Sequence, residues 1–303
     1  MKRRLIRTGV TSALILAFAF MSIASGSSSS DSTKKIDGGS DDNGKQSEAA
    51  ADNDKGNLTI EEQVLVDQDD VKITAKSIDE DGFWGVGVKL LIENNSKKDY
   101  GIACDALMVN NYMISDLFSS SVTAGMKANE TMYLSSSQLS AAGIEKIGQI
   151  EIDFRVYDSD SYDTVIDPDI VTIKTSLYDQ MDTTPNDAGK ELYNSNGIKI
   201  VGKYVDEDSF WGAGILLYIE NNTKDSITVS CDSISVNSFM LTGYLSATVY
   251  PGKMSIDDIT LMSSELEENG ITSIDEVSLS FNIYNSDSYE TIVNTDQITF
   301  STK

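Results

Sequence analysis

The chain contains one long sequence twice at a constant offset, and this repeat restricts the fold more than any other feature. FWGVGVKLLIENN begins at Phe83, and FWGAGILLYIENN begins 127 residues later at Phe210. The correspondence runs without a gap from about Val71–Ile173 to Ile198–Phe300, and roughly forty of about one hundred paired positions are identical. One domain has therefore been made twice.

Alternate residues of the repeated stretch are apolar, a period of two that is typical of a strand with one buried face. In the first copy these residues are Trp84, Val86, Val88, Leu90 and Ile92. Their burial contributes on the order of 10 kcal/mol before the entropy of ordering the chain is subtracted. We expect Trp84 and Trp211 to lie in the core rather than to stack on a ligand. A later strand, with Ile150, Ile152, Phe154 and Val156 on one face, supplies the opposing surface.

Short apolar runs separated by turn-forming residues, without a long amphipathic helix, predict an all-β fold of two tandem antiparallel β-sandwich domains. One short helical turn interrupts the strands at Ser137–Ala142, where Gly143 ends it. The strands predicted in the first copy are 63–67, 71–78, 83–94, 100–104, 106–110, 112–122, 131–135, 149–157 and 164–174.

Composition divides the chain into five segments. Residues 1–24 form a signal peptide, with a basic start and an apolar run that is short for a membrane span. Residues 25–57 are a disordered tether rich in Ser, Gly and Asp. Two repeats follow, repeat 1 at 58–175 and repeat 2 at 191–303, joined by a linker at 176–190. The protein is thus expected outside the cytoplasm, secreted or at the cell surface; an uncleaved leader acting as a membrane anchor is the alternative.

Two resemblances follow from these residues. The leader resembles those of Gram-positive surface lipoproteins, but Ser27 stands where their lipid-bearing cysteine would be. The strand order, the tryptophan of the long strand and phrases such as YDSDSYDT at 157–164 resemble immunoglobulin-like modules of uncharacterised secreted and surface proteins of Gram-positive bacteria. More loosely they resemble secreted mycobacterial immunoprotective antigens. The resemblance implies immunoglobulin-like domains with an extracellular binding or spacer role.

Charge and residue usage exclude several kinds of function. The formal net charge is −25, which disfavours nucleic acid and anionic polymers as partners. The sequence has no histidine, so Ser-His-Asp and Cys-His catalysis and ordinary zinc sites are excluded. We therefore expect no enzyme and assign no catalytic, cofactor-binding or metal-binding residue; a carboxylate-based hydrolase is the least favoured function.

Each repeat carries one cysteine, Cys104 or Cys231. With one thiol per domain, neither domain can close a disulfide of its own. We expect both to act as small buried apolar residues. A bridge between domains or between chains is the alternative.

One end of each domain carries the candidate ligand residues. Alternating oxygens in the turn from Asp158 to Tyr162, and in its copy from Asn285 to Tyr289, could hold calcium; hydrogen bonds that merely stabilise a hairpin tip are the alternative. An immunoglobulin-like strand order would place the Asn-Asn pair of each repeat at the same end. The candidate residues are Asn94, Asn95, Asp158, Asp160, Tyr162, Asn221, Asn222, Asp287 and Tyr289.

Tyrosines beside these turns suggest a second kind of site. Tyr157, Tyr162, Tyr284 and Tyr289 form an aromatic platform for cell-wall glycan or protein, unless they only cover neighbouring strands. The sequence thus predicts an exported, non-enzymatic binding or spacer protein of the bacterial cell surface. Its partner would be an unknown surface protein or glycan, and a calcium-stabilised adhesion module is the alternative.

Overall fold

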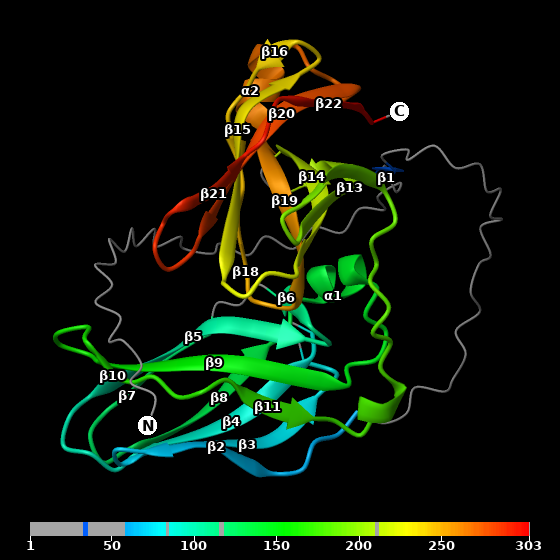
Figure 1. Ribbon diagram of the computed structural model, residues 1–303. Coiled ribbons are helices and arrows are strands. Elements are labelled where there is room, and N and C mark those ends of the chain that lie inside the picture. The colour runs from blue at the N-terminus through cyan, green and yellow to red at the C-terminus, as the bar shows by residue number, and fades with distance from the viewer. Residues whose placement is uncertain (1–32, 36–57, 83–84, 115–117, 210–211, 303) are drawn as a thin grey trace. The chain divides into compact units, whose positions relative to one another are not determined.

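The computed structural model describes residues 33–35, 58–82, 85–114, 118–209 and 212–302, and the compact unit that contains both repeats spans Ser32–Lys303 (Figure 1). Trp84 and Trp211, which we predicted to be buried, lie outside the described residues, as does the leader. Within the predicted tether, strand β1 (Thr33–Lys35) pairs with β13 (Ile198–Ser209) of repeat 2.

Repeat 1 consists of two antiparallel arrays of strands that share one core. The first is a four-stranded sheet in the order β2-β3-β4-β8, formed by β2 (Gln63–Gln68), β3 (Val71–Asp79), β4 (Gly87–Asn94) and β8 (Lys127–Tyr133). The second is centred on the paired strands β5 (Tyr100–Val109) and β9 (Gln149–Asp158). β5 also pairs with β6 (Tyr112–Ile114) and β7 (Ser119–Val122), and β9 with β10 (Thr164–Ile166) and β11 (Val171–Lys174).

Repeat 2 reproduces the two arrays of repeat 1. Its first array is β12 (Lys190–Ser195), β13, β14 (Gly212–Asn221) and β19 (Lys253–Met262). The second is centred on β15 (Ile227–Val236) and β20 (Glu276–Asn285), flanked by β16 (Phe239–Met240), β18 (Ser246–Val249), β21 (Thr291–Asn294) and β22 (Ile298–Ser301). Strand β17 (Gly243–Tyr244) pairs with β19.

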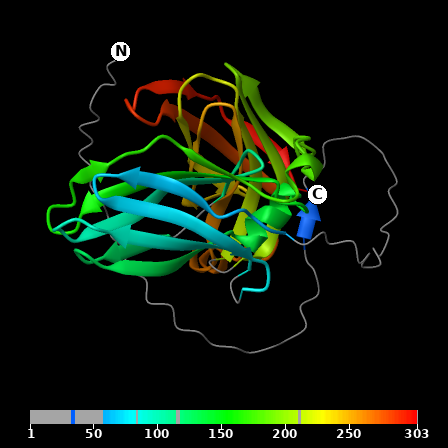
Figure 2. The same cartoon turned by 90° about the horizontal axis from the view of Figure 1, so that it is seen from below.

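The apolar alternation explains why the arrays pack face to face. In β9, Ile150, Ile152, Phe154 and Val156 are fully buried while the residues between them are partly exposed. Their equivalents in β20 are Val277, Leu279, Phe281 and Ile283, which are buried in the core of repeat 2. Each array therefore contributes one face to a core. Figures 1 and 2 show the strands of the two arrays of repeat 1 as separate layers. The prediction of a largely antiparallel all-β protein is confirmed.

The short helix also agrees with the prediction. Helix α1 (Ser136–Ala142) begins after Ser135, whose hydroxyl accepts from the Gln138 amide, and ends at Gly143, which has a left-handed φ of 75°. Repeat 2 has α2 (Ser263–Glu268) at the equivalent place. A single 3₁₀ turn, η1 (Tyr178–Gln180), lies in the predicted linker.

Several predicted strands differ from the structure. The predicted strand 131–135 is β8, which begins earlier, at Lys127, and ends at Tyr133. The predicted strands 100–104 and 106–110 form the single strand β5, which ends at Val109 and has a bulge between Cys104 and Ala106. The predicted strand 112–122 is two strands, β6 and β7, with residues 115–117 outside the described part. The predicted strand 164–174 is also two, because it contains Pro168, which has no N–H to donate to a sheet.

The two repeats share one sheet, which the sequence did not predict. Strand β6 of repeat 1 pairs in parallel with β19 of repeat 2, so that hydrogen-bonded strands continue from β13 through β19 and β6 to β9. Around this junction Lys253 Nζ lies 2.5 Å from Glu151 Oε2, and the Tyr250 hydroxyl donates to Asp153 Oδ2 at 2.9 Å. In the predicted linker, the backbone N–H of Asn186 donates to the Tyr112 hydroxyl at 2.8 Å.

Candidate functional site

The asparagines of the predicted ligand end divide into a buried and an exposed set. Asn94 is fully buried, and its amide nitrogen donates to the carbonyls of Lys98 and Val122, both at 2.8 Å. Its oxygen accepts from the backbone N–H of Ser96 at 3.0 Å and from the Ser96 hydroxyl. These internal hydrogen bonds leave the amide little capacity for a ligand. Asn95 is exposed, and its backbone N–H donates to Asp70 O at 2.8 Å.

Repeat 2 shows the same division. Asn221 is fully buried and donates to the carbonyls of Asp225 at 2.9 Å and Val249 at 2.8 Å. Asn222 is exposed and donates to Glu220 Oε1 at 2.8 Å. In both repeats the first asparagine of the pair therefore holds three segments of chain together.

Asp158 caps its own turn. The carboxylate accepts from the backbone N–H groups of Asp160 at 3.0 Å and Ser161 at 3.2 Å, and lies 2.7 Å from Lys98 Nζ. The bond from Lys98 lowers the pKa of Asp158 and, together with those backbone bonds, stabilises its charged form. The backbone N–H of Ser159 donates to Asp99 O at 3.1 Å, so the Asn94 turn and the Asp158 turn lie at the same end, as predicted.

The equivalent turn of repeat 2 keeps the cap without the ion pair. Asn285 Oδ1 accepts from the backbone N–H groups of Asp287 and Ser288, both at 2.9 Å. Asp225 stands where repeat 1 has Lys98. Among the described residues, no group of three or more Cys, Asp or Glu side chains is arranged to hold a metal ion. Calcium binding stays a prediction.

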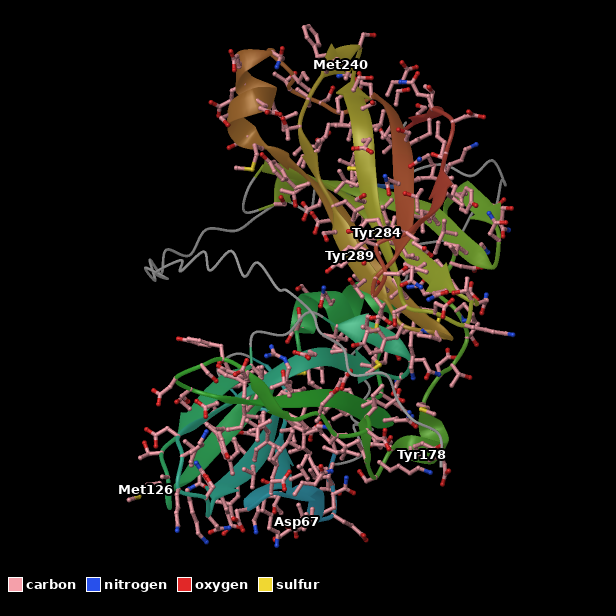
Figure 3. The ribbon with its side chains drawn as sticks, turned by 60° about the vertical axis from the view of Figure 1, so that its left-hand side comes forward. Asp67, Met126, Tyr178, Met240, Tyr284 and Tyr289 are labelled. Carbon is pink, nitrogen blue, oxygen red and sulfur yellow. The ribbon has the colours of Figure 1, made fainter. Side chains whose placement is uncertain are left out.

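Each of these turns presents a pair of stacked tyrosines. The rings of Tyr157 and Tyr162 are 6.0 Å apart at an interplanar angle of 20°, and those of Tyr284 and Tyr289 are 6.3 Å apart at 26°. Figure 3 labels the second pair. The outer tyrosines are 70% exposed at Tyr162 and 74% at Tyr289, so each hairpin tip carries an aromatic face open to solvent.

The tips hold these rings on an ordered backbone. Tyr162 and Tyr289 have left-handed φ values of 62° and 59°, and their N–H groups donate to Asp158 O at 2.8 Å and Asn285 O at 2.9 Å. Side chains other than Asn, Asp and Gly rarely adopt this conformation, which costs of order 1 kcal/mol or more. The surrounding hydrogen bonds therefore maintain a strained position in both copies.

The inner tyrosine of repeat 1 covers its neighbour strand. A side chain at Gly101 would place its Cβ 2.2 Å from the Tyr157 ring, so glycine is what lets the ring lie against the backbone. Arg155 lies 5.4 Å from the centre of the same ring. Both readings of the tyrosines thus apply: Tyr157 covers a neighbouring strand, and Tyr162 projects from the surface.

The structure also contains a cavity that the sequence analysis missed. It has a volume of about 310 Å³ and lies between α1 of repeat 1 and the outer face of β13, β14 and β19. Its lining includes Tyr204 and the carboxylates of Asp206, Asp257 and Asp258. A comparison of the two repeats could have indicated this cavity. On the outer face of the sheet, Leu216 and Ile256 of repeat 2 replace Lys89 and Asn129 of repeat 1.

Asp257→Asn should stabilise the protein at neutral pH. Burial raises the pKa of Asp257 to about 6, with Asp258 adding to the shift and a hydrogen bond from Ser255 Oγ opposing it. Because the pKa of Asp257 is higher in the folded than in the unfolded protein, its protonation stabilises the folded state below about pH 4. This stabilisation is lost as the pH rises through about 6. We expect the variant to gain about 1–2 kcal/mol at pH 7.5 and nothing at pH 4, measured by urea unfolding. An equal gain at both pH values would contradict this, and Asp287→Asn is the exposed control.

Comparisons with known proteins identify no family for this chain. No protein-family model and no curated protein matches the chain. Among solved structures, the YadV chaperone is 10% identical over 77% of this chain and 99% of that one, with a TM-score of 0.24. A Porphyromonas gingivalis W83 protein of unknown function is 10% identical over 71% and 89% (TM-score 0.21), and a Salmonella enterica SafA pilin–SafB chaperone complex is 9% identical over 71% and 88% (TM-score 0.20). At these TM-scores the likenesses carry no argument about function.

No helix in the described part of the chain is long and apolar enough to cross a bilayer.

Proposed function

We propose that the chain is an exported, non-enzymatic binding protein of the bacterial cell surface, which engages its ligand through the two tyrosine-capped hairpin tips. Each repeat is, in this proposal, an immunoglobulin-like β-sandwich. The strand order supports this. In repeat 1, β2, β3, β4 and β8 form one array, and β5 pairs with β9 at the centre of the other; in repeat 2, β12, β13, β14 and β19 form one array, and β15 pairs with β20 in the other.

The repeated, ordered exposure of Tyr162 and Tyr289 carries the proposal. Solvent-exposed aromatic rings on a fixed backbone are typical of binding hot spots, because they supply a large contact area at low entropic cost. The chain maintains the same unfavourable φ at both positions, in turns that share the sequence Ser-Asp-Ser-Tyr. A purely structural hairpin needs neither the ring nor its exposure.

The groups around the rings favour a neutral, hydroxyl-rich ligand. Asp160 and Asp163 flank Tyr162, and Asp287 and Glu290 flank Tyr289, so each tip presents carboxylates that accept hydrogen bonds beside an aromatic face. With a net charge of −25, the chain disfavours anionic polymers. A cell-wall glycan is the ligand that fits this chemistry best.

Tyr162→Ala and Tyr289→Ala should each weaken glycan binding about tenfold, and the double variant about a hundredfold or more, because two tips on one chain bind an immobilised polymer bivalently. A glycan array followed by binding to isolated cell walls measures this. Tyr244→Ala removes a tyrosine that is 56% exposed elsewhere on repeat 2 and is the matched control. If the double variant bound as well as the parent protein, the tips would not be the site.

A further inference from the structure

The contact between the repeats uses a strand of one and a sheet edge of the other. Tyr112 lies opposite Met254 in the parallel pairing of β6 with β19, and both are nearly fully buried, at 4% and 8% exposure. The Tyr112 ring meets that of Tyr218 edge to face at 6.5 Å. Beside the strand, Ala141 of α1 and Leu216 of β14 pack against the same core. The docking surface therefore consists of a short strand and a helix.

Each repeat contains an equivalent of the strand and an equivalent of the sheet edge that make this contact. The chain uses the strand of repeat 1 and the edge of repeat 2, which leaves the strand of repeat 2 and the edge of repeat 1 unused. The unused strand is β16, where Phe239 and Met240 are equivalent to Tyr112 and Met113. They are 47% and 68% exposed, and Figure 3 shows Met240 at the end of repeat 2. Helix α2 lies beside this segment, because the N–H of Thr242 donates to Glu265 Oε2 at 2.7 Å.

The unused sheet edge is β8 of repeat 1, which among the described strands pairs only with β4. It is equivalent to β19, the edge that receives β6 in repeat 2. A bare edge presents unpaired N–H and C=O groups to any strand that can approach.

The substitutions on the two unused surfaces are complementary in charge. In α2, Glu265 and Glu268 replace Gln138 and Ala141 of α1. On the unused sheet, Lys89 and Lys127 replace Leu216 and Met254. The apolar contact inside the chain is thus replaced by an acidic helix on one surface and lysines on the other.

The lysines remain available for such a contact. The Lys89 side chain is 39% exposed and 3.3 Å from Asp79, and the Lys127 side chain is 60% exposed and paired with Glu93. The Lys89–Asp79 pair is exposed and contributes little to stability, so exchanging its partner carries a small penalty. The partner of Lys127 is Glu93, whose side chain is 16% exposed, so this pair would have to be kept in the contact.

We propose that the β16–α2 end of repeat 2 docks on the β8 edge of repeat 1 in a second copy of the chain, with Phe239 opposite Lys127. This heterologous contact joins copies head to tail, and it leaves one free end on each side of the assembly. It is weaker than the contact within the chain, because Met126 and Ser278 stand where that contact has the ion pair of Lys253 and Glu151. Association should therefore be reversible and sensitive to salt.

Sedimentation velocity of the full chain at rising concentration tests the proposal. At low ionic strength we expect the mean mass to grow beyond that of a dimer, and at about 0.5 M salt to return toward the monomer. Met240→Asp should abolish growth, and Glu268→Lys or Lys89→Glu should each weaken association about tenfold. Combining Glu268→Lys with Lys89→Glu should restore it. A chain that stays monomeric at low salt, or association unchanged by Met240→Asp, would overturn the proposal.

Mixing two variants separates a head-to-tail contact from a symmetric one. The Met240→Asp variant cannot dock through β16, but its β8 edge can still receive another copy. A variant with both Lys89→Glu and Lys127→Glu cannot receive a copy on its β8 edge, but it can still dock through β16. Their mixture should form a one-to-one dimer and nothing larger, whereas absence of that dimer would refute the head-to-tail arrangement. Tyr289→Ala lies outside both surfaces and should leave assembly unchanged, so this outcome is independent of the glycan proposal.

Discussion

Replacing Asn221 by alanine should lower the free energy of unfolding by about 2–4 kcal/mol, and Asn94→Ala should do the same in repeat 1. The Asn221 side chain is fully buried and donates to two backbone carbonyls, those of Asp225 and Val249. Alanine leaves both carbonyls without this donor. Urea unfolding followed by circular dichroism measures the loss.

The second asparagine of each pair provides the matched control. Asn95 and Asn222 are exposed, and alanine at either position should change the free energy of unfolding by no more than about 0.5 kcal/mol. If Asn94→Ala and Asn95→Ala proved equally mild, Asn94 would not be the residue that fastens the turn to the end of β7. A ligand role for the buried asparagine would then regain support.

The sequence predicted the parts of the fold that are governed by local patterns. Alternation placed Ile150 to Val156 on one buried face, and the glycine at 143 marked the end of the helix. Both features follow from backbone geometry within a few residues. The strand break predicted at Asp105 was wrong, because the structure has a bulge there and the strand continues. The break near Pro168 was missed, because a proline interrupts pairing without changing the apolar period.

The contact between the repeats was missed for a different reason. The contact uses residues of β14 and β19 whose side chains lie on the outer face of the repeat 2 sheet: Tyr218, Met254 and Ile256. A single sequence does not show whether an apolar residue on such a face is exposed to solvent or covered by another domain. Comparison of the copies would have identified Met254 and Ile256, since repeat 1 has Lys127 and Asn129 at these positions. The divergence of two copies is thus a guide to which face is covered.

The sequence predicted that the turns of the candidate site lie together, and it predicted less well which of their side chains are exposed. The Asp158 turn, the Asn94 turn and Tyr162 do lie at one end of repeat 1. Which of them face solvent depends on hydrogen bonds that only the three-dimensional structure shows, such as those of Asn94 to Lys98 and Val122. Composition alone could not separate the tyrosine that projects from the asparagine that is enclosed.

The cysteines behave as small apolar residues within the described part of the chain. Neither Cys104 nor Cys231 forms a disulfide, and both are half-buried. Burial raises the pKa of the Cys231 thiol to about 11, which keeps it protonated and unreactive at neutral pH.

Phe281→Ala should lower the free energy of unfolding by about 3–5 kcal/mol, because it removes a ring that is 1% exposed from the centre of the repeat 2 core. Phe239→Ala is the matched control in the same repeat: its ring is 47% exposed, and at dilute protein concentration its loss should cost under about 1 kcal/mol. Urea unfolding of both variants measures the difference, and equal losses would mean that Phe281 is not packed as described.

Phe154→Ala, the equivalent change in repeat 1, extends this test to the junction between the repeats. The pairing of β6 with β19 and the burial of Tyr112, Tyr218 and Met254 join the two cores across one sheet. If that junction is strong, Phe154→Ala and Phe281→Ala should each shift a single unfolding transition. If each variant instead moved a separate transition and left the other in place, the contact would be weaker than the stability of either repeat. The second-copy docking that we propose, which lacks the Lys253–Glu151 ion pair, would then be expected only at high protein concentration.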